Sequence, residues 1–252
     1  MSTRMHASDD DTLWRCCDAW PRKLLNKWNS HQFCVRHGVP VPDLYAYVRS
    51  ARRLSLDSLP SRYVIRPLRG TARQGVLVMA DGRDLLSQQP LAPSAVRARL
   101  ASGRGHAAGP FLVEQFIERE DGSGRLPIEY KCHTFGSHVA AIQRTERAHE
   151  GDGGITHRFY RPDWSLFDDP MSTAVPLTRP VAAPPFLDAL LETAAQLGQA
   201  IGTYVRVDMF GSCSGIVFNE FSSMPALRHP KFTPHCRELF GSLWDATFPD
   251  AL

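Results

Sequence analysis

The sequence predicts an α+β fold in which antiparallel hairpins and separate helices follow one another along the chain. Residues 204–208 and 215–222 both alternate in polarity on either side of a short Gly- and Ser-containing connector, which is typical of a β-hairpin. Residues 63–66 and 75–79 are β-branched runs on either side of a glycine-containing loop. Residues 187–201 place leucine, alanine and isoleucine on one face of a helix.

Composition limits the classes of protein that this chain can belong to. With 252 residues, 43% hydrophobic and 10% aromatic, it can bury the core of one large domain or two small ones. A net charge of +3 without a long basic run argues against a nucleic-acid partner. The six cysteines show no CxxC spacing, and Cys16 and Cys17 are adjacent, so we expect reduced thiols in a cytoplasmic protein. No apolar run has the length of a signal-peptide core or a membrane span, so no membrane insertion is expected.

The first half of the chain contains one helix with clear end signals. Asn26 is a plausible N-cap, the helix continues to His37, and Gly38 suits the left-handed position that follows a helix. The first ten residues are expected to be frayed. Further elements are expected at 13–17 and 94–100 as helices, at 44–48 as extended chain, and at 63–66 and 75–79 as strands.

The second half contains more strands. Residues 111–117 are predicted to form a strongly buried strand, and residues 128–135 and 137–143 a hairpin that turns at Gly136. A helix opens at Pro185 and ends before Gly202. Segments 146–157 and 170–185 are rich in Gly or Pro and are expected to be irregular and mobile.

The hairpin near the C-terminus brings polar side chains together. Period-two alternation places Arg206 and Asp208 on one face of the first strand, and Glu220 and Ser222 on one face of the second. Two carboxylates that meet across a ladder repel each other unless a cation or a proton lies between them, and Mg²⁺ prefers oxygen ligands. The alternative is a solvated hairpin with ordinary surface charges.

Two further segments have features of a nucleotide site. The loop that follows the strand at 63–66 has glycines with free backbone N–H groups and several cations, which suit a phosphate cover: Arg66, Arg69, Gly70, Thr71, Arg73 and Gly75. Ordinary turn chemistry with solvated charge explains the same residues. Residues 114–118 offer an apolar wall that ends in acids, suited to adenine and ribose. An ordinary core strand is the alternative there.

The order of these parts resembles the ATP-grasp enzymes. The motifs that carry the resemblance are Asn26-Lys27-Trp28, Gly38-Val39-Pro40-Val41-Pro42, Val64-Ile65-Arg66-Pro67, Val113-Glu114-Gln115-Phe116-Ile117-Glu118, Glu129-Tyr130-Lys131, Arg206-Val207-Asp208 and Asn219-Glu220. A closer resemblance is to the TupA-like branch, named for teichuronopeptide biosynthesis, through residues 127–131, 159–164, 204–208 and 231–234. The resemblance covers residues 27–244.

This resemblance implies two α+β lobes with antiparallel sheets that clasp ATP. It implies an N-terminal extension at 1–22, an N-terminal lobe with the phosphate-covering loop at 23–110, and a nucleotide- and metal-binding lobe at 111–252. Lys27 and Arg66 would hold phosphates under the loop that runs from Arg69 to Gly75. Adenine would meet Glu114, Gln115, Phe116 and Ile117, and ribose would meet Glu118 or Glu120.

The resemblance also implies a catalytic set. Asp208 and Glu220, with Ser222 as a third ligand, would hold Mg²⁺, and Arg206 would stabilise charge on the transferring phosphoryl group. Lys131 and Arg144 would make further phosphate or acyl-phosphate contacts. The chain departs from the family pattern at Arg66, where a lysine is usual, and at Ser222, where asparagine or a threonine-type residue is common.

The function implied is an ATP-dependent carboxylate–amine ligase that works through an acyl phosphate. Its substrates would be a small-molecule or peptide carboxylate and an amine, in cell-surface polymer or peptide natural-product biosynthesis. Because many family members have a longer N-terminal domain for substrate binding, acceptor selection would fall to the irregular segments, to a partner protein or to a homodimer. The alternatives are an ATP-grasp kinase and a non-catalytic nucleotide-binding subunit.

Overall fold

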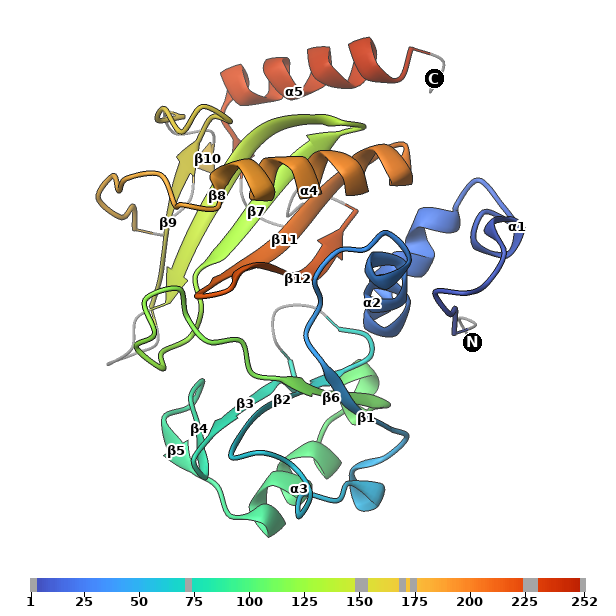
Figure 1. Cartoon of the computed structure of the whole chain (residues 1–252), viewed down its shortest axis with the longest axis vertical. Coiled ribbons are helices and arrows are strands. Elements are labelled where there is room, and N and C mark those ends of the chain that lie inside the picture. The colour runs from blue at the N-terminus through green and yellow to red at the C-terminus, as the bar shows by residue number, and fades with distance from the viewer. Residues whose placement is uncertain are drawn as a thin grey trace.

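Two antiparallel sheets, each covered by helices, form the structure (Figure 1). The computed structural model describes residues 4–70, 74–147, 154–167, 171–172, 176–223 and 231–249. The six-stranded sheet has the order β1-β6-β2-β3-β4-β5, and the five-stranded sheet has the order β12-β11-β7-β8-β9. The expected α+β class with antiparallel sheets is confirmed.

The strands and helices have the following bounds. The six-stranded sheet contains β1 (Leu44–Val48), β2 (Arg62–Pro67), β3 (Leu77–Ala80), β4 (Arg83–Asp84), β5 (Gln89–Pro90) and β6 (Phe111–Gln115). The five-stranded sheet contains β7 (Glu129–Phe135), β8 (His138–Arg147), β9 (Ile155–Tyr160), β11 (Tyr204–Ser212) and β12 (Gly215–Ser222), and β10 (Met171–Ser172) pairs with β13 (Lys231–Phe232). The α-helices are α1 (Asp11–Trp14), α2 (Lys27–Arg36), α3 (Pro93–Ala101), α4 (Leu187–Ile201) and α5 (Pro234–Thr247), with 3₁₀ turns at Trp20–Leu25, Ala51–Arg53 and Gly105–Ala108.

Alternation along the strands of the six-stranded sheet separates a core face from a polar face. Ile65 and Val113 point into a buried cluster with Val96 and Leu100 of α3. The neighbours Val64 and Glu114 are register partners, so their side chains point to the opposite face. That opposite face is directed towards the other sheet.

The five-stranded sheet divides in the same way. Tyr130 and Val207 are buried in the large cluster that also contains Leu190 and Leu197 of α4. Side chains alternate along β7 and β11, so the sequence neighbours of Tyr130 and Val207, among them Lys131, point to the face that lies towards the six-stranded sheet. The two sheets therefore turn towards each other the faces that carry charged side chains such as Glu114 and Lys131.

The register of the β11–β12 hairpin follows the alternation of the sequence. Asp208 is the Cα partner of Glu220, and Arg206 is the partner of Ser222. The two carboxylates therefore lie at opposed positions on one face of the sheet, and the predicted register is confirmed. A bulge follows directly after Asp208.

The N-terminal segment is more ordered than its sequence predicted. Met5 and Trp14 are buried in the same core as α4, and the Met5 amide donates to Asn29 Oδ1 at 2.9 Å. The expected helix at 13–17 forms earlier, as α1. In α2 the expected ends are confirmed: Asn26 Oδ1 accepts from the Trp28 amide, and Gly38 has φ +69°.

Helix α5 and strand β9 are the longest helix and the longest strand that were not predicted. Helix α5 begins with a Thr233 side-chain cap and buries Cys236 and Phe240 against Phe135 and its neighbours on β7. Residues 155–157 begin strand β9 instead of belonging to an irregular segment, whereas 148–153 lie outside the described residues, as do parts of 170–185. Strand β9 forms because pairing with β8 satisfies the hydrogen bonds of its backbone N–H and C=O groups. No local sequence pattern predicts this pairing.

Strand β6 belongs to the six-stranded sheet, where it lies between β1 and β2. A division of the chain between residues 110 and 111 therefore separates β6 from both of its pairing partners.

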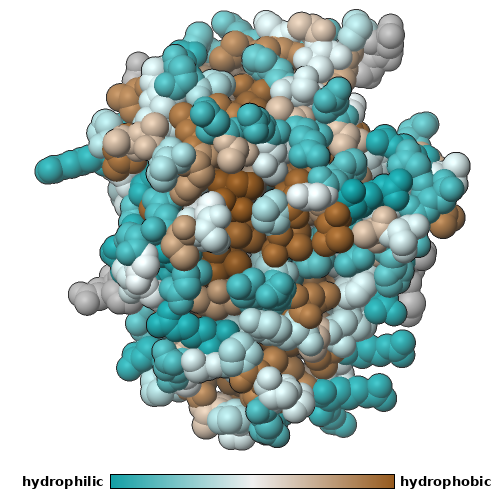
Figure 2. Space-filling view, in the orientation of Figure 1, coloured by the Kyte–Doolittle hydropathy of each residue, from teal (hydrophilic) through white to brown (hydrophobic). Residues whose placement is uncertain are grey.

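Figure 2 shows hydrophobic residues gathered across the middle of one face of the molecule, with hydrophilic residues over much of its margin. Within the described ranges, none of the helices combines the length and apolar character needed to span a bilayer.

We predict that Gly198→Ala destabilises the protein because α4 approaches the β7–β8 turn too closely for a side chain. A Cβ at Gly198 would lie 2.2 Å from Gly136 O and 2.7 Å from Thr134 Oγ1. We expect a loss of about 1–3 kcal/mol in the free energy of unfolding, measured by chemical denaturation. The matched control is Gly241→Ala in α5, where a Cβ meets nothing within 4 Å, and where helix propensity should add roughly 0.5–1 kcal/mol. Equal effects at the two glycines would contradict the prediction.

Candidate functional site

A cavity of about 440 Å³ lies between the polar faces of the two sheets. Its walls include residues of β2, β3, β6, β7, β8, β9, β11, β12 and the start of α2, so segments far apart in sequence meet there. The lining includes six cationic side chains, Lys27, Arg66, Arg69, Lys131, Arg147 and Arg206, and three acidic ones, Glu114, Glu129 and Glu220. The excess of positive charge favours an anionic ligand.

Apolar side chains form the remainder of the cavity wall. They come from both sheets and from the segment that joins them: Val64, Val76, Val78, Leu86, Phe116, Ile117, Leu126, Pro127, Ile155 and Phe210. A cavity that combines a largely apolar wall with several convergent charges is the usual form of a small-molecule site. A ligand with a flat apolar ring and a polyanionic chain would match both parts.

Arg66 joins the two sheets across the cavity. Its Nη1 donates to Asn219 Oδ1 at 2.9 Å, and its Nη2 donates to the Asn219 carbonyl at 3.2 Å. On the other side its Nε lies 2.6 Å from Glu114 Oε2, in an ion pair whose partners are both buried. Because β2 and β6 carry Arg66 and Glu114 while β12 carries Asn219, the guanidinium holds the lobes together.

Lys27 also contacts both sides of the cavity. It is the first residue of α2, and its Nζ lies 3.6 Å from Glu220 Oε2 on β12 and donates to the Gly70 carbonyl at 3.3 Å. Burial lowers the pKa of Lys27, and the nearby charge of Arg66 acts in the same direction against the attraction of Glu220. An anion in the cavity would therefore stabilise the charged form of this lysine.

A line of alternating charges continues along the five-stranded sheet. Asn219 Nδ2 donates to Glu129 Oε1 at 2.7 Å, and Lys131 Nζ lies 2.7 Å from Glu129 Oε2. The same ammonium donates to Asp208 Oδ2 at 3.1 Å. Arg206 binds both oxygens of Asp208, with Nε and Nη2 each at 2.7 Å. Asp208 is completely buried, so both of its oxygens are compensated by cations.

These contacts shift the pKa values of the paired groups. Burial alone would raise the pKa of Asp208, but Arg206 and Lys131 outweigh it and the pKa is lowered. Burial alone would lower the pKa of Lys131, but Asp208 and Glu129 outweigh it and the pKa is raised. Both groups are therefore held in their charged forms.

Many of the predicted site residues meet in this cavity. Those that line it are Lys27, Arg66, Arg69, Gly70, Glu114, Gln115, Phe116, Ile117, Lys131, Arg206 and Glu220. Asp208 lies directly behind Lys131 and Arg206. Thr71 and Arg73 lie outside the described residues. Gly75 lines a separate, smaller cavity, and Ser222 is not among the residues that line the main one.

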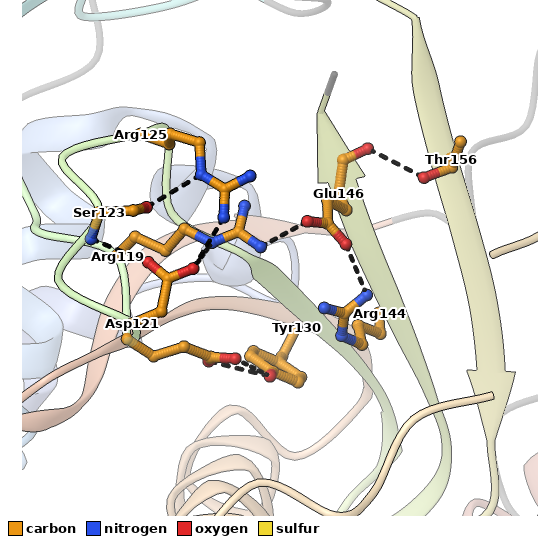
Figure 3. A network of polar contacts seen from close by, with 9 residues as sticks. Arg119, Asp121, Ser123, Arg125, Tyr130, Arg144, Glu146 and Thr156 are labelled. Atoms are coloured by element: carbon orange, nitrogen blue, oxygen red, sulfur yellow. Dashed lines mark hydrogen bonds and ion pairs between the residues drawn. The ribbon is translucent and has the colours of Figure 1, made fainter. Parts of the chain in front are cut away.

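Arg144 is not among the residues that line the cavity, and it shares the sheet face of Tyr130, near which Figure 3 shows it. It is the register partner of Tyr130, whose side chain faces α4, and its Nη1 donates to Glu146 at 3.1 Å. Arg147, three positions later, lines the cavity and has its Nη2 4.0 Å from Glu129 Oε2. Lys131 lines the cavity and is the register partner of Gln143, so period-two alternation directs the odd-numbered side chains of this part of β8, Arg147 among them, towards the cavity.

Two acids expected near ribose are engaged elsewhere. Glu118 forms an ion pair with Arg62, and Glu120 accepts a hydrogen bond from the Tyr130 hydroxyl at 3.0 Å. Neither lines the cavity. Glu129 and Asn219 do line it, although only their motifs were noted in the sequence and neither was assigned a role. Two signals were available in the sequence: Glu129 lies two residues before Lys131 and so shares its face of the strand, and Asn219 directly precedes Glu220 in the Asn-Glu motif.

The carboxylates of Asp208 and Glu220 on the hairpin supply oxygen donors, which are the ligands that Mg²⁺ prefers. Among the described residues no three His, Cys, Asp or Glu side chains form a ready metal cluster. Mg²⁺, however, is commonly held by one or two carboxylates together with phosphate oxygens, so a full protein cage is not required. Asp208 and Glu220 offer such a pair at opposed positions of one ladder.

His133 is a buried neutral residue beside the charged line. It is the register partner of Arg206, its Nδ1 lies 2.9 Å from the Tyr204 hydroxyl, and its ring packs against Phe240 of α5. Burial, with a smaller contribution from Arg206, lowers its pKa from 6.5 to about 3. The imidazole is therefore uncharged at neutral pH.

Comparisons with known proteins identify the fold. No protein-family model matches this chain, and no curated protein is significantly similar to it. Its structure resembles D-alanine–D-alanine ligase from Bacillus anthracis complexed with ATP, with a TM-score of 0.56 and 15% identity over 89% of this chain and 65% of that one. For biotin carboxylase from Campylobacter jejuni the TM-score is 0.57 and the identity 14%, over 92% of this chain and 47% of that one. For the ATP-grasp ligase PsnB complexed with a minimal precursor the TM-score is 0.51 and the identity 11%, over 90% of this chain and 61% of that one. The chain thus has the ATP-grasp fold and spans between 47% and 65% of the length of these three proteins.

We predict that Arg66→Met costs about 3–5 kcal/mol of unfolding free energy, because it leaves the buried Glu114 carboxylate without its cation. The double variant Arg66→Met with Glu114→Gln should cost less than the single one, since the uncompensated charge is then absent. Chemical denaturation of wild type and of each variant measures both values. A double variant less stable than Arg66→Met would show that the ion pair is not the source of the loss.

We predict that His133 makes the protein less stable in mild acid. Its pKa is about 3 in the folded state and 6.5 ordinarily, so below pH 6.5 the unfolded chain takes up a proton that the folded chain refuses. This residue should therefore lower the free energy of unfolding by up to about 1.4 kcal/mol for each pH unit below 6.5. Denaturation of wild type and His133→Gln at pH 7 and pH 5 should show a smaller loss in the variant. His138→Gln, at an exposed position of β8, is the control and should behave like wild type.

Proposed function

We propose that this chain is an ATP-dependent ligase that joins a carboxylate to an amine through an acyl phosphate. The observation that carries the proposal is the cavity itself, which apolar side chains and a surplus of cations line between the two sheets of an ATP-grasp fold. Such a site accommodates an adenine ring at one end and a triphosphate at the other. The resemblance to the TupA-like branch supports a role in cell-surface polymer or peptide natural-product biosynthesis.

The cavity residues divide between the parts of the nucleotide. Phe116 and Ile117 would pack against adenine, while Lys27, Arg66 and Arg69 would neutralise phosphate oxygens. Because Arg66 and Lys27 already join the two lobes, their positions are set before the ligand arrives. Preorganised cations stabilise charge without a reorganisation cost during the reaction.

The proposed reaction has two steps. An oxygen of the substrate carboxylate attacks the γ-phosphorus of ATP, the bond to the β,γ-bridging oxygen breaks, and ADP leaves. The amine then attacks the acyl carbon, inorganic phosphate leaves with the electron pair of the C–O bond, and the amine loses a proton. Arg206 and Lys131 would stabilise negative charge on the transferring phosphoryl group. Mg²⁺, held by Asp208 and Glu220, would neutralise the phosphate oxygens when bound.

The identity of the two substrates is a separate part of the proposal. The solved structures named above include a D-alanine–D-alanine ligase and a ligase bound to a precursor, which supports small-molecule or peptide substrates. This chain spans at most 65% of those proteins, and we propose that its acceptor site involves the irregular segments, a partner protein or a second copy. A cytoplasmic location, expected from the cysteine pattern, stays a prediction.

We predict that MgATP, a mixture of amino acids and hydroxylamine yield a hydroxamate, because hydroxylamine captures an acyl phosphate. Without hydroxylamine, mass spectrometry should detect a product equal to acid plus amine less one water, with ADP and phosphate in equal amounts. A stable phosphorylated acceptor with no hydroxamate would instead identify a kinase. Tight ATP binding without turnover on amino-acid and dipeptide mixtures would identify a nucleotide-binding subunit.

We predict that Glu220→Gln lowers turnover by about 10²-fold or more, because it removes a proposed metal ligand in the range typical for lost transition-state charge stabilisation. Its side chain is 37% exposed and its ion pair with Lys27 spans 3.6 Å, so folding should survive. Glu192→Gln, on the exposed surface of α4, is the matched control and should keep full activity. Equal turnover in the two variants at saturating Mg²⁺ would exclude Glu220 as a ligand.

A further inference from the structure

The ammonium of Lys131 lies where a cation between two carboxylates would lie. Its Nζ is 2.7 Å from Glu129 Oε2 and 3.1 Å from Asp208 Oδ2, and the three residues come from the neighbouring strands β7 and β11. The side chain is 15% exposed and lines the cavity. The lysine therefore compensates both acids and still reaches the space in which a ligand would bind.

The surrounding charges leave no excess of negative charge for a free metal ion. Glu129 and Asp208 are matched by Lys131 and Arg206, and the lining of the cavity as a whole contains six cations against three glutamates. Both oxygens of Asp208 already accept hydrogen bonds from cationic groups. A divalent cation that enters alone would meet like charge at close range and would have to displace an ammonium.

The two cations on Asp208 differ in how easily they can leave it. Arg206 holds both carboxylate oxygens with a planar fork, and its side chain is 10% exposed. Lys131 is a point charge on a flexible four-carbon stem, with a single contact to each acid. A polyphosphate in the cavity would attract the lysine and so free one oxygen of Asp208 and one of Glu129.

We propose that Lys131 is a tethered counter-cation that excludes divalent metal from Asp208, one of the two proposed magnesium ligands, until a polyphosphate enters the cavity and draws the lysine away from Asp208 and Glu129. The inference rests on the proposed magnesium-ATP function and deepens it, because it sets the order in which the ligands bind. Metal enters with the nucleotide and not before it. Lys131 thus has a positioning role in the resting protein that precedes any contact with phosphate.

The test measures Mn²⁺ binding in the absence of nucleotide, acid and amine, by isothermal titration calorimetry and by the loss of the free-ion electron paramagnetic resonance signal. Wild type should show no saturable site. Lys131→Met should bind Mn²⁺ at least about tenfold more tightly, because it removes a positive charge a few ångströms from the carboxylates. Lys131→Arg keeps the charge and should behave like wild type.

Two results would overturn the inference. One is an unchanged Mn²⁺ affinity in a folded Lys131→Met protein, and the other is nucleotide-free binding by wild type as tight as in that variant. If thermal denaturation shows that Lys131→Met does not fold, Lys131→Gln, which keeps a hydrogen-bond donor for both acids, replaces it with the same expected direction. Because no substrate is present, absence of ligase activity would leave this measurement unaffected, so the two proposals fail separately.

Discussion

A continuous line of paired charges connects the two sheets, and the geometry of the cavity depends on it. It runs from Glu114 through Arg66 and the Asn219 amide to Glu129, and continues along the five-stranded sheet to Arg206. Each buried charge is compensated by a neighbour, since an isolated charge at such a position would cost several kcal/mol. Arg66 is the member that spans both lobes.

The same line explains why the cavity remains positively charged. Its acids are compensated inside the protein, and the six cations that line the cavity outnumber the three glutamates there, so a net positive charge remains to attract a ligand. The apolar backs of both sheets are packed against α3 and α4, which keeps the strands rigid beneath these charges. Rigid support and compensated acids together preorganise a polyanion site.

Much of the site could be predicted because strand alternation is local. The shared face of Arg206 and Asp208 and the opposed positions of Asp208 and Glu220 follow from period two and a short connector. Lys131 and Arg144 were expected in the cavity from the family resemblance, and the register of β8 places Arg147 there instead of Arg144. The partners of Glu118 and Glu120 depend on the path of a loop, and the path of a loop cannot be predicted from sequence periodicity.

By itself the sequence determined the local elements: the cap at Asn26, the left-handed glycines after α2 and α4, and the strands whose side chains alternate. These depend on hydrogen bonds and sterics within a few residues. Only the tertiary structure decided that β6 inserts between β1 and β2, that α5 covers Phe135, and that Arg66 meets Asn219 across 153 positions of chain. Such pairings are chosen by burial and charge compensation over the whole molecule, so no short window of sequence contains them.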